Sequence, residues 1–158
     1  MQNLENYLTE HPFFADFQPE HLALVAGCAK NVRFEDGDYL GKALEEANQF
    51  FILRTGRVVI EIHAAQRGDI QIQTLGAGDV IGWSWLVLPY RWHFHIRATE
   101  LTRAIALDGV CLRQKCSEDH ELGYEFMTRI AHLMEQRLKA TTMQLIDIYG
   151  KQNTPFGW

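Results

Sequence analysis

The stretch F-F-I-L-R-T-G-R-V-V-I-E-I, residues 50–62, decides the class of fold. It opens with four apolar residues, the length of a short buried strand, and Thr55-Gly56 then turns the chain. Apolar side chains return at every second position from Val58 to Ile62, which is the period of a half-buried strand. The stretch therefore predicts two β-strands joined by a tight glycine turn.

The same combination of short strand and glycine turn recurs on both sides of this stretch. E-D-G-D at residues 35–38 lies between two short apolar segments, and Q-R-G-D at residues 66–69 is a hairpin turn. L-G-A-G-D at residues 75–79 ends the next alternating segment, and residues 97–107 carry two more strands. Short strands spaced about ten residues apart and punctuated by glycine predict a mainly β protein, an antiparallel sandwich, roll or barrel.

Helical patterns occupy both ends of the chain. Apolar residues have helix-like spacing in the first 30 residues, so residues 1–30 are predicted as N-terminal helices. The strands then span residues 31–108, and residues 109–150 are predicted as C-terminal helices. A length of 158 residues fits one domain with a core of its own, so residues 1–158 are predicted to form a single domain.

The long C-terminal helix has more apolar surface than one small β domain can cover. It is expected to begin after an N-cap at Ser117 and to end at Gly150, a length of roughly 30 residues or about 45 Å. Its apolar residues recur three to five positions apart, so we expect a second copy to bury part of this stripe in a homodimer. The alternative is a helix that folds back along its own sheet. The residues predicted for the dimer interface are Leu122, Phe126, Ile130, Leu133, Leu138 and Leu145.

Composition and charge exclude several classes of protein. The net charge is −5 and no run of lysine or arginine stands out, which argues against a nucleic-acid-binding surface. No segment approaches the roughly 20 apolar residues of a membrane span, and the acidic N-terminus is unlike a signal peptide. We therefore expect a cytoplasmic protein that binds neither DNA nor a membrane.

The three cysteines, Cys28, Cys111 and Cys116, are not spaced like the ligands of a zinc or iron–sulfur site. In a reducing cytoplasm they are expected to be free thiols, mostly buried. The sequence leaves open whether one of them has a redox role.

One stretch is the candidate site, G-D-V-I-G-W-S-W-L-V-L-P-Y-R-W-H-F-H-I-R-A, residues 78–98. It opens like a strand, turns through Gly82 and holds three of the chain's four tryptophans within ten residues. Arginines and histidines follow in its second half, so any pocket of the protein is expected to be lined by this segment. His93 and His95 share one face of an extended chain, but no third ligand of matching spacing accompanies them, and no metal site is predicted.

The order of these segments resembles the cyclic nucleotide-binding domain of the bacterial catabolite-activator and fumarate–nitrate-regulator group. The resemblance rests on V-R-F-E-D-G-D-Y-L at residues 32–40, the stretch at residues 50–60, L-G-A-G-D-V-I-G at residues 75–82 and I-R-A at residues 96–98. The glycines are its most specific part, because they mark the turns of the roll. The resemblance implies an antiparallel β-roll of the jelly-roll kind, with N-terminal helices and a long C-terminal dimerisation helix.

In that family a glycine and a glutamate begin the segment that binds the cyclic phosphate, and an arginine about ten residues later pairs with the phosphate. Gly82 matches the glycine, but Trp83 stands at the glutamate position and Trp92 at the arginine position. An indole has one donor and no acceptor, so Trp83 cannot replace a carboxylate. Arg91 is one residue away from the arginine position, and a shift of one residue reverses the face of an extended segment.

Two outcomes remain open for this loop. In one, it binds a nucleotide-like effector, a cyclic nucleotide or NAD(P)H, stacked on tryptophan with Arg91 on a phosphate. In the other, the tryptophans fill the pocket and nothing binds. The candidate ligand-binding residues are Gly82, Trp83, Ser84, Trp85, Arg91, Trp92 and His93.

G-W-S-W-L at residues 82–86 and Y-R-W-H-F at residues 90–94 are similar to stand-alone members of the group, which include accessory subunits of NAD-reducing nickel–iron hydrogenases. Only eight residues follow Gly150, fewer than the helix-turn-helix domain of the transcription factors needs, so we expect that the chain does not read DNA. The resemblance therefore implies a non-enzymatic regulatory or sensor subunit that acts through a protein partner, such as a redox-enzyme complex. The alternatives are a ligand-free docking subunit and a cupin-like enzyme, which needs a metal triad that the sequence does not offer.

Overall fold

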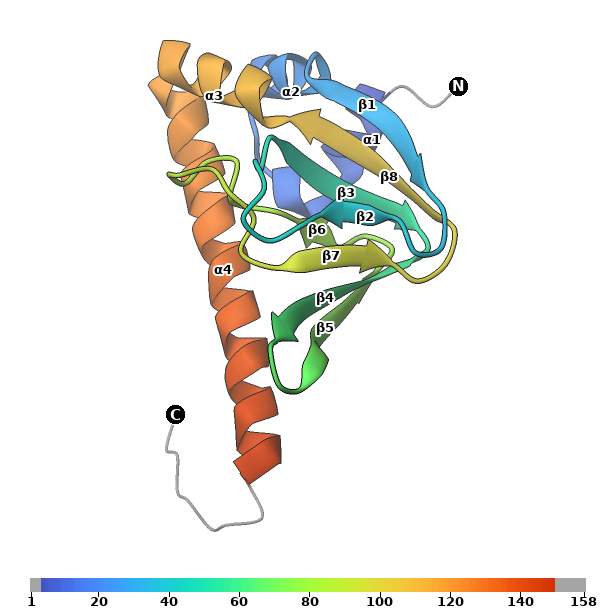
Figure 1. Ribbon diagram of the computed structural model, residues 1–158. Coiled ribbons are helices and arrows are strands. Elements are labelled where there is room, and N and C mark those ends of the chain that lie inside the picture. The colour runs from blue at the N-terminus through green and yellow to red at the C-terminus, as the bar shows by residue number, and fades with distance from the viewer. Residues whose placement is uncertain (1–3, 150–158) are drawn as a thin grey trace.

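Two four-stranded antiparallel sheets form the body of the molecule in the computed structural model, which describes residues 4–149 (Figure 1). The first sheet has the strand order β1-β8-β3-β6, and the second has the order β2-β7-β4-β5. The predicted antiparallel roll of the jelly-roll kind is thereby confirmed. The strands are β1 (Ala29–Phe34), β2 (Tyr39–Gly41), β3 (Gln49–Thr55), β4 (Arg57–Ala64), β5 (Gly68–Gly76), β6 (Val80–Ile81), β7 (His95–Ala98) and β8 (Thr102–Asp108).

Strand β3 shows why its sequence is a continuous apolar run. Phe50 and Ile52 belong to a core cluster shared with the helices, whereas Phe51 and Leu53 belong to a second cluster between the two sheets. A strand that is covered on both faces needs apolar residues at every position. The turn that follows depends on Gly56, which has a φ of +95° and lies so close to β8 that an added Cβ would meet backbone and side-chain atoms at 2.4–2.6 Å.

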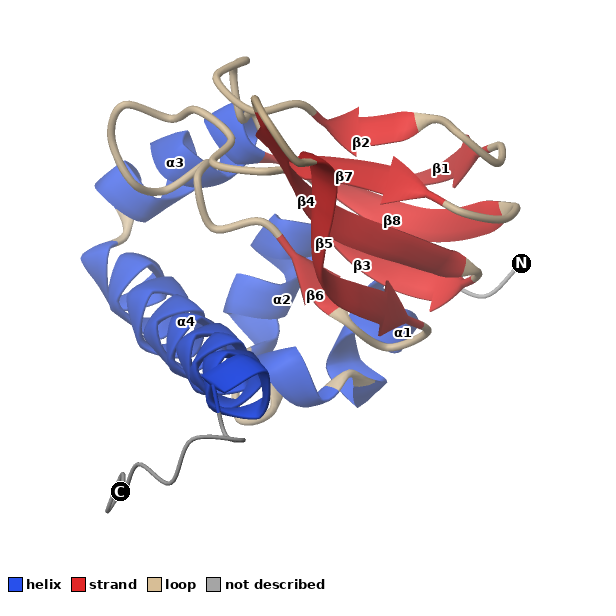
Figure 2. Ribbon diagram, turned by 60° about the horizontal axis from the view of Figure 1, so that its bottom comes forward, coloured by secondary structure: helices blue, strands red, loops and turns tan. Residues whose placement is uncertain are grey.

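The helices gather on one side of the strands (Figure 2). They pack on the β3 and β8 side of the first sheet, and Phe126 lies at their centre, with its ring in edge contact with Phe14, Phe17 and Trp85. No helix within residues 4–149 has both the length and the apolar character that crossing a membrane requires. The expected end at Gly150 lies outside the described residues. The helices are α1 (Leu4–Glu10), the 3-10 helix η1 (Pro12–Phe14), α2 (Pro19–Ala26), α3 (Gly109–Glu118) and α4 (His120–Tyr149).

The inner face of α4 is covered by the chain's own core, which corrects most of the predicted dimer interface. Leu122, Phe126, Ile130 and Leu133 are buried in the cluster that α4 shares with α1, α2 and the first sheet. These four side chains satisfy the periodicity by packing on their own roll, so they are not available to a second copy. Of the six predicted residues, only Leu138 and Leu145 are exposed.

A second apolar row runs along the exposed side of α4, and we call it the outer stripe. Its residues recur at alternating intervals of three and four, which is the heptad spacing of a coiled-coil seam. Most of its large side chains are exposed, and Leu138 reaches 69%. The C-terminal turns of α4 also extend past the β4–β5 hairpin (Figure 1). The outer stripe consists of Tyr124, Met127, Ala131, Met134, Leu138, Thr141, Leu145 and Ile148.

Asp119, rather than the predicted Ser117, caps α4. Its Oδ1 accepts hydrogen bonds from the main-chain N–H groups of Glu121 and Leu122, at 3.1 and 3.2 Å. Its Oδ2 lies 3.0 Å from Nε2 of His21, a buried residue of α2. The Leu122 N–H and then His21 hold the pKa of Asp119 below its usual value. The cap therefore also ties the start of α4 to α2.

Cys28 and Cys111 form a disulfide, which corrects the expectation of three free thiols. Cys28 follows α2, Cys111 lies in the first turn of α3, and their Cα atoms are 5.8 Å apart, an ordinary separation for a disulfide. The two are separated by 83 residues in the sequence, so their spacing carried no sign of the pairing. Cys116 is free and half-buried, and burial raises the pKa of its thiol to about 11.

Candidate functional site

The loop between β6 and β7 is paired with a strap formed by residues 42–48. Arg91 and Trp92 run along this strap, and Glu46 and Arg91 face each other as an isolated antiparallel bridge. Adjacent side chains of an extended segment point to opposite sides, so Arg91 and Trp92 must face opposite ways. The main-chain hydrogen bonds of the pairing are Leu44 N to Trp92 O at 2.9 Å, Trp92 N to Glu45 O at 3.0 Å and Ala47 N to Tyr90 O at 2.8 Å.

Trp92 faces inward and fills the space between the two sheets. Its side chain is 6% exposed, and its indole stacks on Phe51 with an angle of 14° between the rings. A Cβ added at Gly41 would lie 2.4 Å from the indole, and one added at Gly82 would lie 3.1 Å from it. The indole therefore lies directly against Gly82, the glycine that the resemblance places beside the cyclic phosphate.

Arg91 faces outward, as its pairing with the strap requires. Its side chain is exposed, and its Nη1 donates a hydrogen bond of 2.9 Å to the main-chain oxygen of Leu44. His93, two residues further along, is exposed as well. Among residues 4–149 no carboxylate forms an ion pair with Arg91. The predicted cation of the site is thus on the surface, and it is free to meet an anionic group of another molecule.

The remaining predicted site residues divide between core and rim. Trp85 is fully buried against Phe50 and Phe126, so its expected contact with a ligand is replaced by core packing. Ser84 is buried next to it, while Trp83 is half-buried at the edge of the same cluster. The structure therefore does not bring the seven residues together around one cavity.

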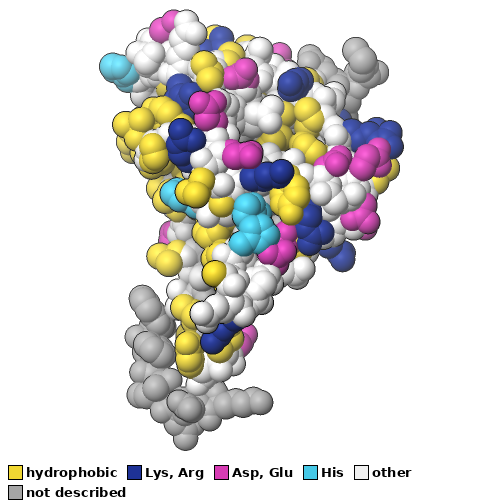
Figure 3. Space-filling model, viewed as in Figure 1, with side chains coloured by type: hydrophobic (Ala, Val, Ile, Leu, Met, Phe, Trp, Pro, Cys, Tyr) yellow, Lys and Arg dark blue, Asp and Glu magenta, His cyan; other side chains and the backbone are white. Residues whose placement is uncertain are grey.

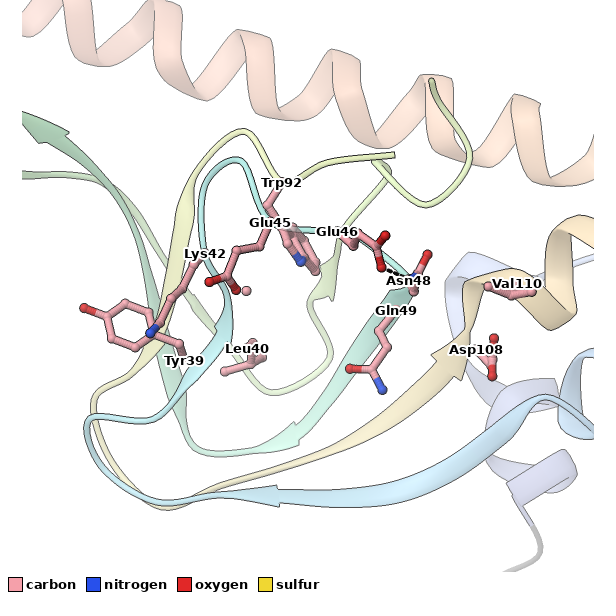
Figure 4. A pocket seen from close by; sticks show the side chains of 11 residues that line it. Tyr39, Leu40, Lys42, Glu45, Glu46, Asn48, Gln49, Trp92, Asp108 and Val110 are labelled. Atoms are coloured by element: carbon pink, nitrogen blue, oxygen red, sulfur yellow. Dashed lines mark hydrogen bonds between the residues drawn. The ribbon is translucent and has the colours of Figure 1, made fainter. Parts of the chain in front are cut away.

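A shallow cavity of about 460 Å³ opens beside Trp92 (Figure 4). It has three carboxylates, those of Glu45, Glu46 and Asp108, and one cation, Lys42, which lies 5.0 Å from the centre of the Tyr39 ring. A phosphate placed here would meet more negative than positive charge. The cavity is lined by Tyr39, Leu40, Gly41, Lys42, Glu45, Glu46, Asn48, Gln49, Trp92, Asp108 and Val110.

On the second sheet, Arg97 of β7 pairs with Glu61 of β4. Its Nε lies 2.9 Å from Oε1 of Glu61, a carboxylate that is almost fully buried. The rings of His95 and His63 lie beside this pair, with centres 3.9 Å apart and planes inclined at 50°. Burial and then the neighbouring His63 lower the pKa of His95. Nδ1 of His63 is in contact with Oδ1 of Asp69.

Sequence reasoning missed the strap, which decides the character of the site. Residues 42–48 look like a polar connection, and nothing in their composition identifies their partner across the roll. One signal was available in Gly41, since a glycine next to a strand often marks the close approach of another group. That group is the indole of Trp92.

The model of the family described as the cyclic nucleotide-binding domain matches residues 31–119, more than half of the chain. No curated protein matches the sequence. These matches do not test the resemblance of the loop motifs to hydrogenase accessory subunits.

Solved structures share the fold at low sequence identity. A protein of Geobacter metallireducens described as a cyclic nucleotide-binding protein is 24% identical with a TM-score of 0.77, over 87% of this chain and 98% of that one. A cyclic nucleotide-binding domain from Methylobacillus flagellatus is 17% identical with a TM-score of 0.71, over 98% and 85%. The sensor domain of a transcriptional regulator of Pseudomonas aeruginosa is 14% identical with a TM-score of 0.69, over 86% and 91%.

Proposed function

Because this chain belongs to the cyclic nucleotide-binding domain family, we propose that it is a non-enzymatic regulatory subunit that has given up the family's ligand and acts through a protein partner. The observation that carries the proposal is the position of Trp92, whose indole lies between the sheets and against Gly82. The acidic cavity beside it supports the same conclusion, because it would repel a phosphate. A regulatory or sensor role is typical of this fold.

The tip of the loop between β6 and β7, together with the strap, is the surface proposed to meet the partner. Loops are normally polar, yet Leu44 and Leu88 are 78% and 74% exposed, and Val87 and Pro89 are exposed beside them. Apolar side chains gather over this loop next to basic ones in the space-filling view (Figure 3). Exposed apolar residues around one arginine are typical of protein interfaces. We call Leu44, Val87, Leu88, Pro89 and Arg91 the loop-tip surface.

A homodimer through the outer stripe of α4 is the second part of the proposal. The heptad spacing from Tyr124 to Ile148 supports it, as does the exposure of Met127, Met134 and Leu138 on a helix whose other face is already buried. A single copy leaves this row of large apolar side chains in water. Two copies paired along α4 would bury the rows against each other.

For the partner we propose a soluble NAD-reducing nickel–iron hydrogenase or a similar redox-enzyme complex. The support is the similarity of G-W-S-W-L and Y-R-W-H-F to accessory subunits of those enzymes. In this structure Trp85 and Trp92 of the two motifs are buried and anchor the loop in the core, while Arg91 of the second motif is exposed on the surface of the loop. A docking role accounts for an aromatic loop that does not enclose a ligand.

The closed pocket predicts that nucleotides leave the protein's thermal stability unchanged. A ligand that binds only the folded state raises the melting temperature by mass action. Thermal-shift measurements with cAMP, cGMP, NAD(H) and NADP(H), each up to millimolar concentration, are therefore expected to show no stabilisation. A shift at micromolar cAMP would show that the loop opens and Trp92 leaves its site, and the proposed loss of the ligand would be wrong.

Arg91→Ala is expected to weaken binding to the partner complex by about 1.5–3 kcal/mol if Arg91 meets a carboxylate, the range for hydrogen bonds to charged groups. That is about a 10- to 150-fold rise in Kd, measurable by biolayer interferometry on the immobilised hydrogenase. Arg91→Lys should recover part of the loss, because lysine keeps the charge and loses the bidentate fork.

The melting temperature of the Arg91 variants should stay that of the parent, because an exposed cation contributes little to folding. Arg33→Ala, also an exposed arginine but outside the loop-tip surface, serves as the matched control. Equal affinity of Arg91→Ala and Arg33→Ala for the complex would remove Arg91 from the docking surface. No binding of the parent chain would reject this class of partner.

A further inference from the structure

A second cavity, remote from the strap and the loop tip, lies between α4, η1 and the turn from β5 to β6. Its volume is about 340 Å³, the size of a small-molecule site. One wall is apolar, formed by Pro12, Phe13 and Leu133, and the α4 side carries two arginines. We call it the α4 cleft. Its lining residues are His11, Pro12, Phe13, Gly78, Asp79, Val80, Arg129, His132, Leu133, Gln136 and Arg137.

The α4 cleft has more positive than negative charge among its lining residues. Arg129 and Arg137 face a single carboxylate, Asp79, whose Oδ2 already accepts a hydrogen bond of 2.8 Å from the N–H of Gly76. Neither arginine forms an ion pair within the described part of the chain. Both instead donate to main-chain oxygens, Arg129 to that of Ala15 and Arg137 to that of Val80 at 2.6 Å.

Arg137 is the more constrained of the two cations. Burial lowers its pKa, and the nearby Asp79 only partly offsets this. Its Nη2 donates to the main-chain oxygen of Val80, and its other N–H groups have no hydrogen-bond partner among residues 4–149. A partly desolvated guanidinium with donors to spare is a strong site for a phosphate or carboxylate, which it can bind in a bidentate manner.

The α4 cleft would remain open in the proposed dimer. At 3.6 residues per turn, residues two apart on a helix lie about 200° apart around its axis. Three cleft residues are each two positions away from a residue of the outer stripe. The pairs are Met127 and Arg129, His132 and Met134, and Gln136 and Leu138. Arg129, His132 and Gln136 therefore lie across α4 from the outer stripe, whereas Arg137 is about 40° from Thr141 around the axis and is held against Val80 of the roll. A second copy seated on the stripe would leave the Arg129 side of the cleft open.

We propose that the α4 cleft binds a small organic anion. Its phosphate or carboxylate group pairs with Arg137, Arg129 adds positive charge at the rim, and its apolar part lies against Pro12, Phe13 and Leu133. Since the cleft joins α4 to the N-terminal segment and to the roll, such a ligand fixes the position of α4 on the roll. The ligand would therefore act as an effector at a site other than the closed pocket of the family. This proposal does not depend on the identity of the protein partner.

Isothermal titration calorimetry on the full chain tests the proposal with three probes at matched ionic strength: inorganic phosphate, phenyl phosphate and succinate. Comparing phosphate with succinate distinguishes the two acidic groups, and comparing phenyl phosphate with phosphate measures the contribution of the apolar wall. At least one probe is expected to bind. Arg137→Gln should weaken that probe by about tenfold or more, the loss expected for a hydrogen bond between charged groups.

Asp79→Asn gives a test in the opposite direction. The asparagine oxygen can still accept from Gly76, so the turn is kept while a repelling charge is removed, and binding should tighten. Arg67→Gln, in the β4–β5 turn away from the cleft, removes the same charge as Arg137→Gln and should change nothing. Arg137→Lys keeps the charge and a donor for the main-chain oxygen of Val80 but loses the bidentate fork, so it should also weaken binding. This variant tests the site if Arg137→Gln does not fold.

Two results would overturn the site. One is the absence of binding by all three probes, since each carries the proposed acidic group. The other is binding whose affinity is the same in the parent, Arg137→Lys and Asp79→Asn, because this would place the anion elsewhere on the protein. Neither result bears on the closed pocket at Trp92, which the nucleotide titrations address.

Discussion

Replacing Trp92 with alanine is expected to lower the free energy of unfolding by about 3–5 kcal/mol, the range for removing a large aromatic side chain from a core. The indole stacks on Phe51 and lies against the main chain at Gly41 and Gly82. Two of its neighbours are glycines, which have no side chain that could move into the space. The cavity left by the substitution should therefore collapse little, and its cost should be at the upper end of this range.

Urea denaturation followed by circular dichroism measures this loss. His93→Ala, one residue away but exposed, is the control and should stay within about 0.5 kcal/mol of the parent. Added indole is expected to raise the melting temperature of Trp92→Ala and not that of the parent, because an apolar cavity of this kind accepts an aromatic guest. If Trp92→Ala is as stable as His93→Ala, the indole does not fill the roll.

Leu138→Asp is expected to convert the proposed homodimer into monomers. Leu138 is at the middle of the outer stripe, and symmetry places two copies of it close together in the seam. A carboxylate in each would be buried without a partner, and we expect the dimer Kd to rise by at least about 100-fold. The roll itself should keep its melting temperature when measured as a monomer, since Leu138 is 69% exposed in a single chain.

Light scattering coupled to size-exclusion chromatography at micromolar concentration gives the mass directly. Thr128→Asp adds the same charge to an exposed position of α4 outside the outer stripe, and it should leave the dimer intact. A parent chain that runs as a monomer would contradict the dimer, and a Leu138→Asp variant that stays dimeric would place the interface on another surface.

The strands and turns could be predicted because their causes are local. The Phe50–Leu53 run, the alternation after Gly56 and the turn glycines each describe a short piece of chain whose burial follows from its own period. The ion pair of Arg97 was predictable for a similar reason, since an arginine on a half-exposed strand finds an acid on the neighbouring strand.

The errors arose where two distant segments decide the outcome. Which of Arg91 and Trp92 faces inward depends on hydrogen bonds to the strap, about 45 residues earlier in the chain. In the sequence of α4, two rows of apolar residues overlap, and one row packs on the roll while the other is exposed. Only the way the helix lies on the roll decides that Leu133 is buried and Leu138 is exposed. Pairing of Cys28 with Cys111 likewise needs the fold to bring two helices together.

The disulfide also divides the chain into what two copies can exchange and what they cannot. Cys28 precedes β1 and Cys111 follows β8, so the bond closes a covalent ring that contains all eight strands. A strand inside this ring has no free end, so it can leave its sheet only as part of a loop whose two ends stay joined by the disulfide. Helix α4 lies outside the ring, so exchange of a free-ended segment between oxidised copies is limited to the helical ends of the chain.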